Sequence, residues 1–471
     1  MRSLIRTLLV MLTGGILLYV NLLALQTPVE LAQSRAKLKL GVVELNHGLL
    51  SEDDEEETGG GTSGTKKEKE SPGDWDDTGT AGGKASGGLS HRTRKEDQVR
   101  PNEERVQDAL DWLNDHQNRE GNWSATDFAE DSNRTKAKHT GSIEFVTDEN
   151  SDQGWVDVAD IGLTGLSVLS FTGCGYSHKS GEYRLTLRNA LLWLRKAQDN
   201  DGCFGPKDDD HFVYNHAIAA KAVAELYGLS GDAVLKPVAD RAVDFILKAQ
   251  NPGLGWRYGV QPGINDSSVT GWMLDALVTA RRVGLEFDYS KSFSDAENWF
   301  ELVTVKVNGF MRTGYDSPGS NSARLIPVTK YKTHPTMNAV YVTTMLDTGK
   351  RDKADKTVLS HVNGCIEKDN LPIWDHYKID FYYWYFASEA LFRVGGEKWE
   401  KWSKAANDVL LKNQRGFSAA DKKAELTSAD TFDEYGSWDP VGAWGGAGGR
   451  VYSTAMGALI LETEWRSYRK G

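Results

Sequence analysis

The chain has 471 residues, a formal net charge of −12 and three cysteines. An acidic balance of this size disfavours a nucleic-acid-binding function, because a protein that neutralises phosphates needs a basic surface. Cys174, Cys203 and Cys365 are too few and too scattered for a disulfide framework, and we interpret them as small apolar residues.

Residues 1–45 are predicted to hold a membrane anchor or a signal peptide, followed by a short stalk. Arg2 and Arg6 flank the start of the apolar run LLVMLTGGILLYVNLLAL, which approaches the length of a membrane-spanning helix. We favour an uncleaved anchor, because no clear small-x-small cleavage site follows the run. This predicts membrane attachment through an N-terminal helix with an extracytoplasmic folded domain, or a secreted or periplasmic protein if the segment is cleaved.

Residues 46–100 are predicted to form a disordered acidic, Gly- and Ser-rich linker. They contain SEDDEEE, GGGTSGTKKEKE and very few apolar residues, so they cannot bury enough surface to fold. Within them, Asp74–Gly79 (DWDDTG) imitates a D-x-D-D-T acid motif. A general acid needs a water-poor site to keep a raised pKa, and a solvated spacer provides none, so we do not interpret this motif as catalytic.

From residue 101 onward one sequence unit recurs. Gln117, Gln198 and Gln250 each have an aromatic residue five positions earlier, an apolar residue four positions earlier and an aromatic residue six positions later. Gln414 starts a fourth, weaker copy, whose Trp438 follows only after an insertion. A Gln near a helix end can satisfy terminal backbone groups that lack intrahelical partners, while the ring packs across the turn.

Two kinds of helix alternate along this part of the chain. Amphipathic helices are predicted near 103–117, 184–198, 236–250, 293–306, 353–366 and 398–414. Helices richer in small and apolar residues are predicted near 160–172, 214–228, 267–284, 335–347, 380–395 and 452–466. Such hairpins cannot bury their surface alone, and six of them are enough to close a ring. We therefore predict an all-α fold, an (α/α)6 toroid at residues 101–471, with the amphipathic helices outside and the apolar helices inside.

The segments ALDWLNDHQNREGNW, ALLWLRKAQDNDGCFG and AVDFILKAQNPGLGW resemble the Gln-Trp repeats of the squalene-hopene cyclase, oxidosqualene cyclase and protein prenyltransferase superfamily. The resemblance covers roughly residue 101 to the end, and it implies an α/α toroid around a central cavity that handles an isoprenoid. In squalene-hopene cyclases a D-x-D-D motif opens an inner helix, and its middle Asp protonates the substrate. The matching stretch here, DVAD, has Ala159 at that place, between Asp157 and Asp160.

Residues at the inner-helix N-termini are the functional candidates, since these ends gather on one face of a closed ring. Asp160, His216 and Asp380 are predicted as acid, base or cation-stabilising residues. The predicted cavity-lining or ligand-binding residues are Asp157, Tyr214, Asp266, Trp272, His334, Tyr383 and Trp384. Helix capping is the competing interpretation of the carboxylates. Aromatic walls suit either a prenyl chain or a sugar stacked on a ring with carboxylates nearby.

No metal site and no cofactor are predicted. Asp201, Cys203 and His216 resemble parts of the zinc site of protein prenyltransferases. However, Cys203 lies in the turn of the Gln repeat, and zinc needs three or four converging ligands.

Three functions remain open from the sequence. The chain is a terpenoid cyclase- or prenyltransferase-like toroid that binds an isoprenoid or other apolar ligand, a non-catalytic scaffold at the cell envelope, or a carbohydrate-active (α/α)6 lyase or hydrolase. For the third function, the test pairs of carboxylates are Asp375 with Asp380 and Asp157 with Asp160. A deep aromatic pocket with carboxylates at its mouth favours an enzyme, whereas a filled centre favours a scaffold.

Overall fold

The computed structural model describes residues 100–138, 140, 154, 159–322, 334–375 and 377–467, all of which belong to one compact unit. The predicted anchor or signal peptide, the predicted linker and Asp157 lie outside these residues. Among the helices in the described ranges, none has the length and hydropathy that a membrane span requires.

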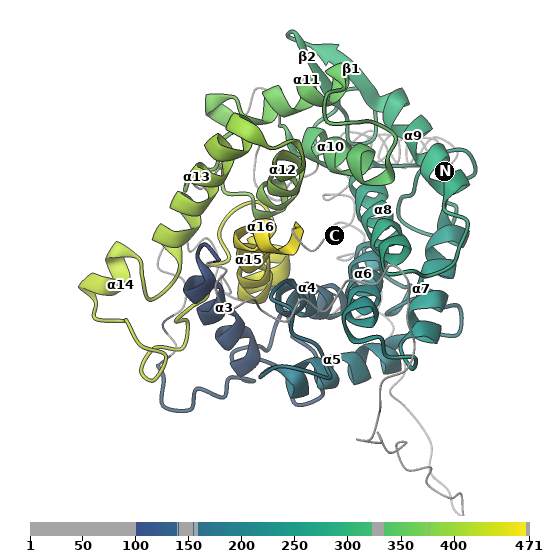
Figure 1. The fold of residues 1–471 in the computed structure, drawn as a ribbon. Helices are drawn as coiled ribbons and strands as arrows, with labels where there is room; N and C mark the ends of the chain where they lie inside the picture. The colour runs from purple at the N-terminus through teal and green to yellow at the C-terminus, as the bar shows by residue number, and fades with distance from the viewer. Residues whose placement is uncertain are drawn as a thin grey trace, which may run out of the picture. The chain divides into compact units, whose positions relative to one another are not determined.

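Outer and inner helices alternate along the described chain, as the sequence predicts (Figure 1). The outer helices are α3 (Glu103–Asp115), α5 (Arg184–Ala197), α7 (Lys236–Ala249), α9 (Ser290–Val303), α11 (Lys356–Cys365) and α13 (Gly396–Asn413). The inner helices are α4 (Asp160–Gly173), α6 (Phe212–Ser230), α8 (Ser267–Arg282), α10 (Thr336–Thr348), α12 (Phe381–Val394) and α15 (Gly445–Leu461). Shorter helices are η2 (Lys368–Asn370), α14 (Ala419–Lys423) and α16 (Thr463–Ser467).

The inner helices form a closed ring. Each one packs against the next along the chain, and the last, α15, packs against the first, α4. Glycines allow these helices to approach closely: a Cβ at Gly165 of α4 would lie 2.9 Å from Ile218 of α6, and one at Gly271 of α8 would lie 2.4 Å from Val340 of α10. In a ring of this order, α6 and α12 lie on opposite sides of the centre.

The repeated Gln residues join consecutive outer helices. The Nε2 group of Gln117 donates to Gly121 O in its own turn and to Thr186 O of α5, both at 2.8 Å. Gln198 and Gln250 make the same two contacts, with the outer contact to α7 and α9 respectively. Gln414 completes the ring, because it donates to Gly436 O at 2.7 Å and to Arg105 O of α3 at 2.8 Å. The four Gln offsets therefore mark real contacts between neighbouring hairpins.

Glycine is required in these turns. Gly121, Gly202 and Gly436 have φ values of 107°, 92° and 90°. A Cβ at each would lie 2.4, 2.3 and 2.2 Å from a backbone oxygen of the neighbouring outer helix. The turn can reach that helix only without a side chain.

The fourth hairpin departs from the predicted all-α fold. The helix predicted to reach residue 306 ends at Val303, and strands β1 (Thr304–Val307) and β2 (Phe310–Thr313) form an antiparallel hairpin. β-branched residues and the turn residues Asn308 and Gly309, both with positive φ, explain the change. The hairpin contacts α11, where Met311 N donates to the Ser360 hydroxyl at 2.8 Å. The strand hairpin therefore connects the neighbouring outer helices α9 and α11, which no described Gln repeat joins.

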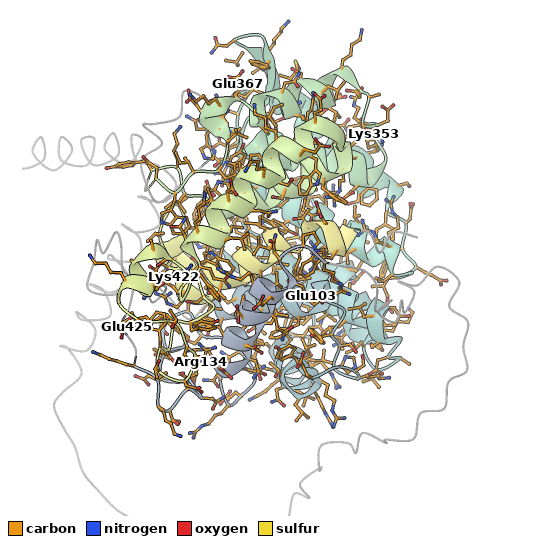
Figure 2. The ribbon with its side chains drawn as sticks, turned by 60° about the vertical axis from the view of Figure 1, so that its left-hand side comes forward. Glu103, Arg134, Lys353, Glu367, Lys422 and Glu425 are labelled. Carbon is orange, nitrogen blue, oxygen red and sulfur yellow. The ribbon has the colours of Figure 1, made fainter. Side chains whose placement is uncertain are left out.

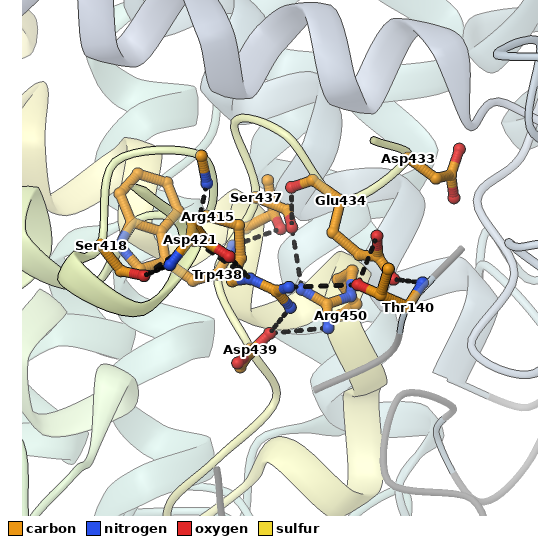
Figure 3. Close-up of polar contacts among 12 residues, drawn as sticks. Thr140, Arg415, Ser418, Asp421, Asp433, Glu434, Ser437, Trp438, Asp439 and Arg450 are labelled. Atoms are coloured by element: carbon orange, nitrogen blue, oxygen red, sulfur yellow. Dashed lines mark hydrogen bonds and ion pairs between the residues drawn. The ribbon is translucent and has the colours of Figure 1, made fainter. Parts of the chain in front are cut away.

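Long-range contacts fasten the last hairpin to the first. Arg134, labelled near α3 in Figure 2, donates to Asp115 at 2.8 Å and to the carbonyls of Asp433 and Tyr435 at 2.9 and 2.8 Å. Figure 3 shows two neighbouring guanidinium groups, of Arg415 and Arg450, that share Asp439 Oδ1 at 2.8 and 2.7 Å. Both arginines are buried, so these ion pairs stabilise the segment between α13 and α15 from the inside.

The Gln414→Ala variant tests ring closure. It removes three hydrogen bonds, two donated to Gly436 O and Arg105 O and one accepted from Arg105 Nε, so we expect a loss of about 2–3 kcal/mol in the free energy of unfolding. Asn413→Ala is the matched control, because its amide bonds only to Val409 O within α13, and we expect a loss of less than about 0.5 kcal/mol. Urea unfolding measures both, and equal losses would contradict a closing role for Gln414.

Candidate active site

The centre of the ring is filled by side chains from opposite helices. Lys221 Nζ of α6 donates to Asp275 of α8 at 2.6 Å and to the Tyr385 hydroxyl of α12 at 2.8 Å. Trp272 of α8 stacks on Tyr385 with ring centroids 5.7 Å apart and an interplanar angle of 9°. Lys221, Trp272 and Tyr385 are buried. These side chains cross the middle of the ring, and we call them its floor. The candidate residues lie at the N-terminal ends of the inner helices.

Asp266 stands at this end, as the N-cap of α8. Its Oδ1 atom accepts a hydrogen bond from Val269 N at 2.7 Å, which satisfies a helix-terminal amide. Its own amide donates to Trp256 O at 2.9 Å, so the Gln-repeat turn of the third hairpin fixes its position. The capping interpretation of this residue is therefore confirmed, but it accounts for only one of the two carboxyl oxygens.

Four tyrosines have pKa values raised by burial, and they lie close enough to Asp266 for its charge to raise these values further. We call them the tyrosine cluster, and its members are Tyr214, Tyr258, Tyr315 and Tyr382. Tyr258 and Tyr315 are joined through their hydroxyl groups at 2.8 Å, and the rings of Tyr214 and Tyr258 lie 6.1 Å apart. The Tyr382 hydroxyl contacts the Ser268 hydroxyl at 2.8 Å. Burial, followed by the charge of Asp266, raises the pKa of Tyr214 and of Tyr315, so both remain neutral phenols.

The environment of Asp266 favours its protonated form. Asp266 is 0% exposed, and burial raises its pKa to about 7. Its Oδ2 atom has no hydrogen-bond partner within the described ranges, and the nearest cationic group, Arg257 Nε, lies 3.8 Å away. A carboxyl group that holds its proton near neutral pH is suited to general-acid chemistry.

A second carboxylate, Asp380, lies at the start of α12. It caps that helix by accepting from Tyr383 N at 3.0 Å, and its Oδ2 atom lies 3.3 Å from His334 Nε2. His334 is fixed through Nδ1, which contacts the Thr336 hydroxyl at 2.6 Å. Both Asp266 and Asp380 act electrostatically on Tyr382 of α12, whose hydroxyl contacts Ser268 of α8. Five predicted site residues therefore lie on or next to the helices of one half of the ring, from α6 through α8 and α10 to α12: Tyr214, Asp266, Trp272, His334 and Asp380.

Two predicted catalytic residues make structural contacts instead. Asp160 accepts from Ala125 N at 2.8 Å and from the Asn122 amide at 3.2 Å, and so holds the loop after α3. His216 accepts from Phe204 N at 3.0 Å through Nδ1, and its Nε2 contacts Ala242 O at 3.1 Å.

The other Gln repeats explain the place of His216. There the aromatic residue of the turn donates its backbone N–H to an inner-helix threonine: Trp123 to Thr164, Trp256 to Thr270 and Trp438 to Thr454. His216 occupies the same position in its own hairpin, and it is fully buried with its pKa lowered to about 4 by that burial. These contacts favour a structural role.

Two predicted lining residues point elsewhere. The Tyr383 hydroxyl donates to Cys365 O at 3.2 Å, and its ring packs on Trp402 of α13, so it faces the outer layer. Trp384 is buried against Phe381 and Trp374. In the FYYWYF segment the residues that contact Trp272 are Tyr382, Tyr385 and Phe386. The spacing i, i+3, i+4 on one helical face was the signal that could have identified them.

Arg257, Tyr258 and Tyr315 were also missed from the sequence. Arg257 and Tyr258 directly follow the turn residue Trp256, and Tyr315 follows the strand hairpin, so all three come from loops. Asp375, proposed as a partner of Asp380, accepts from Tyr377 N at 3.1 Å in the loop before α12. The described residues contain no group of three or more His, Cys, Asp or Glu placed to hold a metal ion. Burial raises the pKa of Cys203 to about 12, which disfavours the thiolate that zinc would need.

No family model matches the sequence, and the curated proteins give no match. Two solved structures are similar to the chain. One is an inactive variant of an α-1,6-mannanase of Salegentibacter sp. HEL1_6 in complex with α-1,6-mannotriose, with a TM-score of 0.48, 10% identity, and coverage of 77% of this chain and 98% of that one. The other is a novel α-amylase from Clostridium perfringens, with a TM-score of 0.45, 10% identity, and coverage of 77% and 97%. The isoprenoid chemistry that the repeats implied stays a prediction.

Substitutions at His216 test its structural role. Thr supplies the acceptor that Phe204 N needs, as in the other hairpins, whereas Ala leaves that buried N–H unpaired. We expect His216→Ala to be about 1–2 kcal/mol less stable than His216→Thr at pH 7.5. Because the native pKa lies below the ordinary value of 6.5, wild-type stability falls as pH drops from 6.5 towards 4, and both variants should show a smaller fall. Urea unfolding at pH 7.5 and pH 5 measures this, and equal stability of the two variants would contradict it.

Asp266 should make the protein less stable as pH rises. Its native pKa of about 7 exceeds the ordinary 3.8, so the folded state binds more protons between these values and the free energy of unfolding falls across that range. Asp266→Asn keeps an Oδ1 acceptor for Val269 N and removes the charge, so we expect it to exceed wild type by about 1–3 kcal/mol at pH 8 and to match it at pH 5. Asp355 caps α11 with a lowered pKa, so Asp355→Asn should instead destabilise at pH 8. A destabilised Asp266→Asn at pH 8 would contradict the assignment.

Proposed function

We propose that the chain is a carbohydrate-active protein that binds a glycan at the N-terminal ends of its inner helices and hydrolyses it by acid–base catalysis. The observation that carries this proposal is a buried carboxyl group, Asp266, which is half-protonated near neutral pH and enclosed by the tyrosine cluster. Sugars stack on aromatic rings, and their hydrolysis needs one carboxyl group in the acid form and another as the carboxylate.

The two carboxyl groups have environments that separate their roles. Asp266 Oδ2 is free of competing hydrogen bonds and can donate its proton to the glycosidic oxygen as the C–O bond breaks. Asp380, beside His334, is the candidate base that removes a proton from the attacking water. The proton gained by Asp380 and the one lost by Asp266 are restored through solvent, so the net reaction adds one water across the bond.

A sugar can reach Asp266 only if the side chains that cover this residue move. Tyr214, Tyr258 and Arg257 are partly exposed, whereas Asp266 itself is 0% exposed. A sugar ring can reach Oδ2 once the Tyr258 and Arg257 side chains turn outward, and it can then pack in the place of those side chains. The Trp272–Tyr385 floor limits how deeply it enters.

An isoprenoid ligand is less compatible with this ring. Its long apolar chain would need the central space, which holds the ion pair between buried Lys221 and part-buried Asp275, and breaking such a pair is costly. If the predicted N-terminal anchor holds the domain outside the cytoplasm, the substrate class becomes a cell-envelope or environmental glycan.

Activity is tested with purified protein and soluble α-linked oligosaccharides, including α-1,6-mannotriose, by reducing-end release and by calorimetric binding. We expect Asp266→Asn and Asp380→Asn to lower turnover by about 100-fold or more with binding retained, and Tyr258→Ala to weaken binding. Turnover should fall as pH rises through about 7, because Asp266 then loses its proton.

Asp244→Asn, on the outer surface of α7, is the control and should leave turnover unchanged. Binding without turnover in the wild type would replace the hydrolase proposal with a non-catalytic glycan-binding toroid. The absence of both across the oligosaccharide panel would overturn the proposal.

A further inference from the structure

Arg257 lies between two carboxylates without a hydrogen bond to either. Its Nε atom is 3.8 Å from Asp266 Oδ2, and its Nη1 atom is 3.7 Å from Asp316 Oδ2. Both Arg257 Nε and Asp266 Oδ2 are buried and lack a hydrogen-bond partner in the described part of the chain. A buried, unpaired donor that faces a buried, unpaired acceptor is costly, so the pair indicates a second arrangement in which they meet.

Aromatic rings hold the guanidinium in this intermediate position. Its Cζ atom lies 5.5 Å from the Tyr258 ring centroid and 5.6 Å from that of Tyr315. The two rings are coupled through their hydroxyl groups. Cation–π contacts depend weakly on direction compared with hydrogen bonds, so the guanidinium can shift towards either carboxylate while it keeps its contact with the rings.

Asp316 is positioned by its own turn. Its Oδ1 atom accepts from the hydroxyls of Ser317 and Ser320 at 3.1 and 3.2 Å, which leaves Oδ2 directed at Arg257. The preceding residues are fixed to the start of α8, where Ser267 donates to Gly314 O at 2.7 Å through Oγ and to Tyr315 O at 2.8 Å through its amide. Asp316 is exposed and Asp266 is buried, so the outer carboxylate is open to a ligand while the inner one is not.

We propose that Arg257 is a positioning residue shared between Asp316 and Asp266, and that a shift of its guanidinium onto Asp266 Oδ2 converts the acid into an anion, with the proton released to solvent. The inference rests on the proposed function for its catalytic meaning. A ligand that engages Asp316 at the rim without turning Arg257 outward releases the guanidinium towards Asp266 and switches the acid off, so rim binding and the proton state of the acid are coupled. In the resting state Asp266 keeps its proton and is ready to donate it.

The groups that face Asp266 come from several elements. They are Arg257 and Tyr258 from the loop before α8, Ser268 of α8, Tyr214 of α6, Tyr315 and Asp316 from the loop after β2, and Tyr382 of α12. The tyrosines are neutral phenols with raised pKa values, so they do not change charge between pH 4 and pH 8. Arg257 and Asp316 are therefore the charged members of the set that can move the titration of Asp266.

The experiment follows the titration of Asp266 without any glycan. The free energy of unfolding is measured from pH 4 to pH 8 for wild type, Asp316→Asn, Arg257→Met and the double variant, each with Asp266 and with Asp266→Asn. The difference between each pair reports the proton affinity of Asp266 alone. We expect Asp316→Asn to lower that affinity by about tenfold, and Arg257→Met to raise it.

The double variant distinguishes two ways in which Asp316 can change the proton affinity of Asp266: through movement of Arg257, or directly through its own charge. If Arg257 mediates the effect, Asp316→Asn changes nothing once Arg257 is Met. A shift of the same size in the Arg257→Met background, or no shift from Asp316→Asn in the wild type, would overturn the proposal. Arg257→Gln is a second neutral variant in case the Met side chain disturbs the tyrosine cluster.

Turnover measurements distinguish failure of the hydrolase proposal from failure of the proposed coupling among Arg257, Asp316 and Asp266. If a substrate is cleaved, the alkaline limb of the pH profile of kcat should move to lower pH in Asp316→Asn by the same tenfold factor in proton affinity. If no glycan is cleaved and the stability titration shifts as expected, the hydrolase proposal falls while the coupling of Arg257, Asp316 and Asp266 stands.

Discussion

The hydrogen bonds of the repeated Gln side chains are the constraint on which the rest of the structure depends. One amide group uses both of its hydrogens, on a carbonyl of its own turn and on a carbonyl of the next outer helix. This geometry sets the distance between consecutive hairpins, and the glycine turns let the backbones meet. Because Gln414 makes the same two contacts, with Gly436 O of its own turn and with Arg105 O of α3, the last hairpin is held to the first in the same way. The inner-helix N-termini are consequently brought to one end.

That arrangement gives capping residues a second use. Asp266 and Asp380 each satisfy a helix-terminal amide through Oδ1, which fixes the carboxyl group and leaves Oδ2 directed elsewhere. For Asp266 the second oxygen is buried without a hydrogen-bond partner in the described residues, and for Asp380 it lies beside His334. Capping and function were competing interpretations of these carboxylates in the sequence. In the structure they are compatible, since each role uses a different oxygen.

The sequence predicted the ring well because ring formation rests on local, repeated contacts. The Gln offsets and the apolar inner helices were visible in it, and the six hairpins follow from them. The identity of the lining residues depends on helix rotation instead, so Tyr383 and Trp384 were chosen where Tyr382 and Tyr385 face Trp272. Loop residues such as Tyr258 and Tyr315 reach Asp266 from distant positions, and no periodic pattern marks them. His216 stands where other hairpins have a threonine that accepts a hydrogen bond from the turn, and the sequence pattern did not indicate this contact.

The contents of the ring are specified separately from the ring itself. The residues that close it lie in the outer layer and its turns, whereas the centre is set by inward-facing residues that no repeat contact restrains. Here they include a lysine–aspartate pair and a tyrosine–tryptophan stack. The resemblance in the repeats therefore predicts the architecture of the ring but not its ligand. A polar floor moves any binding site towards the rim, where loops of different hairpins meet, and the loop residues Arg257 and Asp316 lie there beside Asp266.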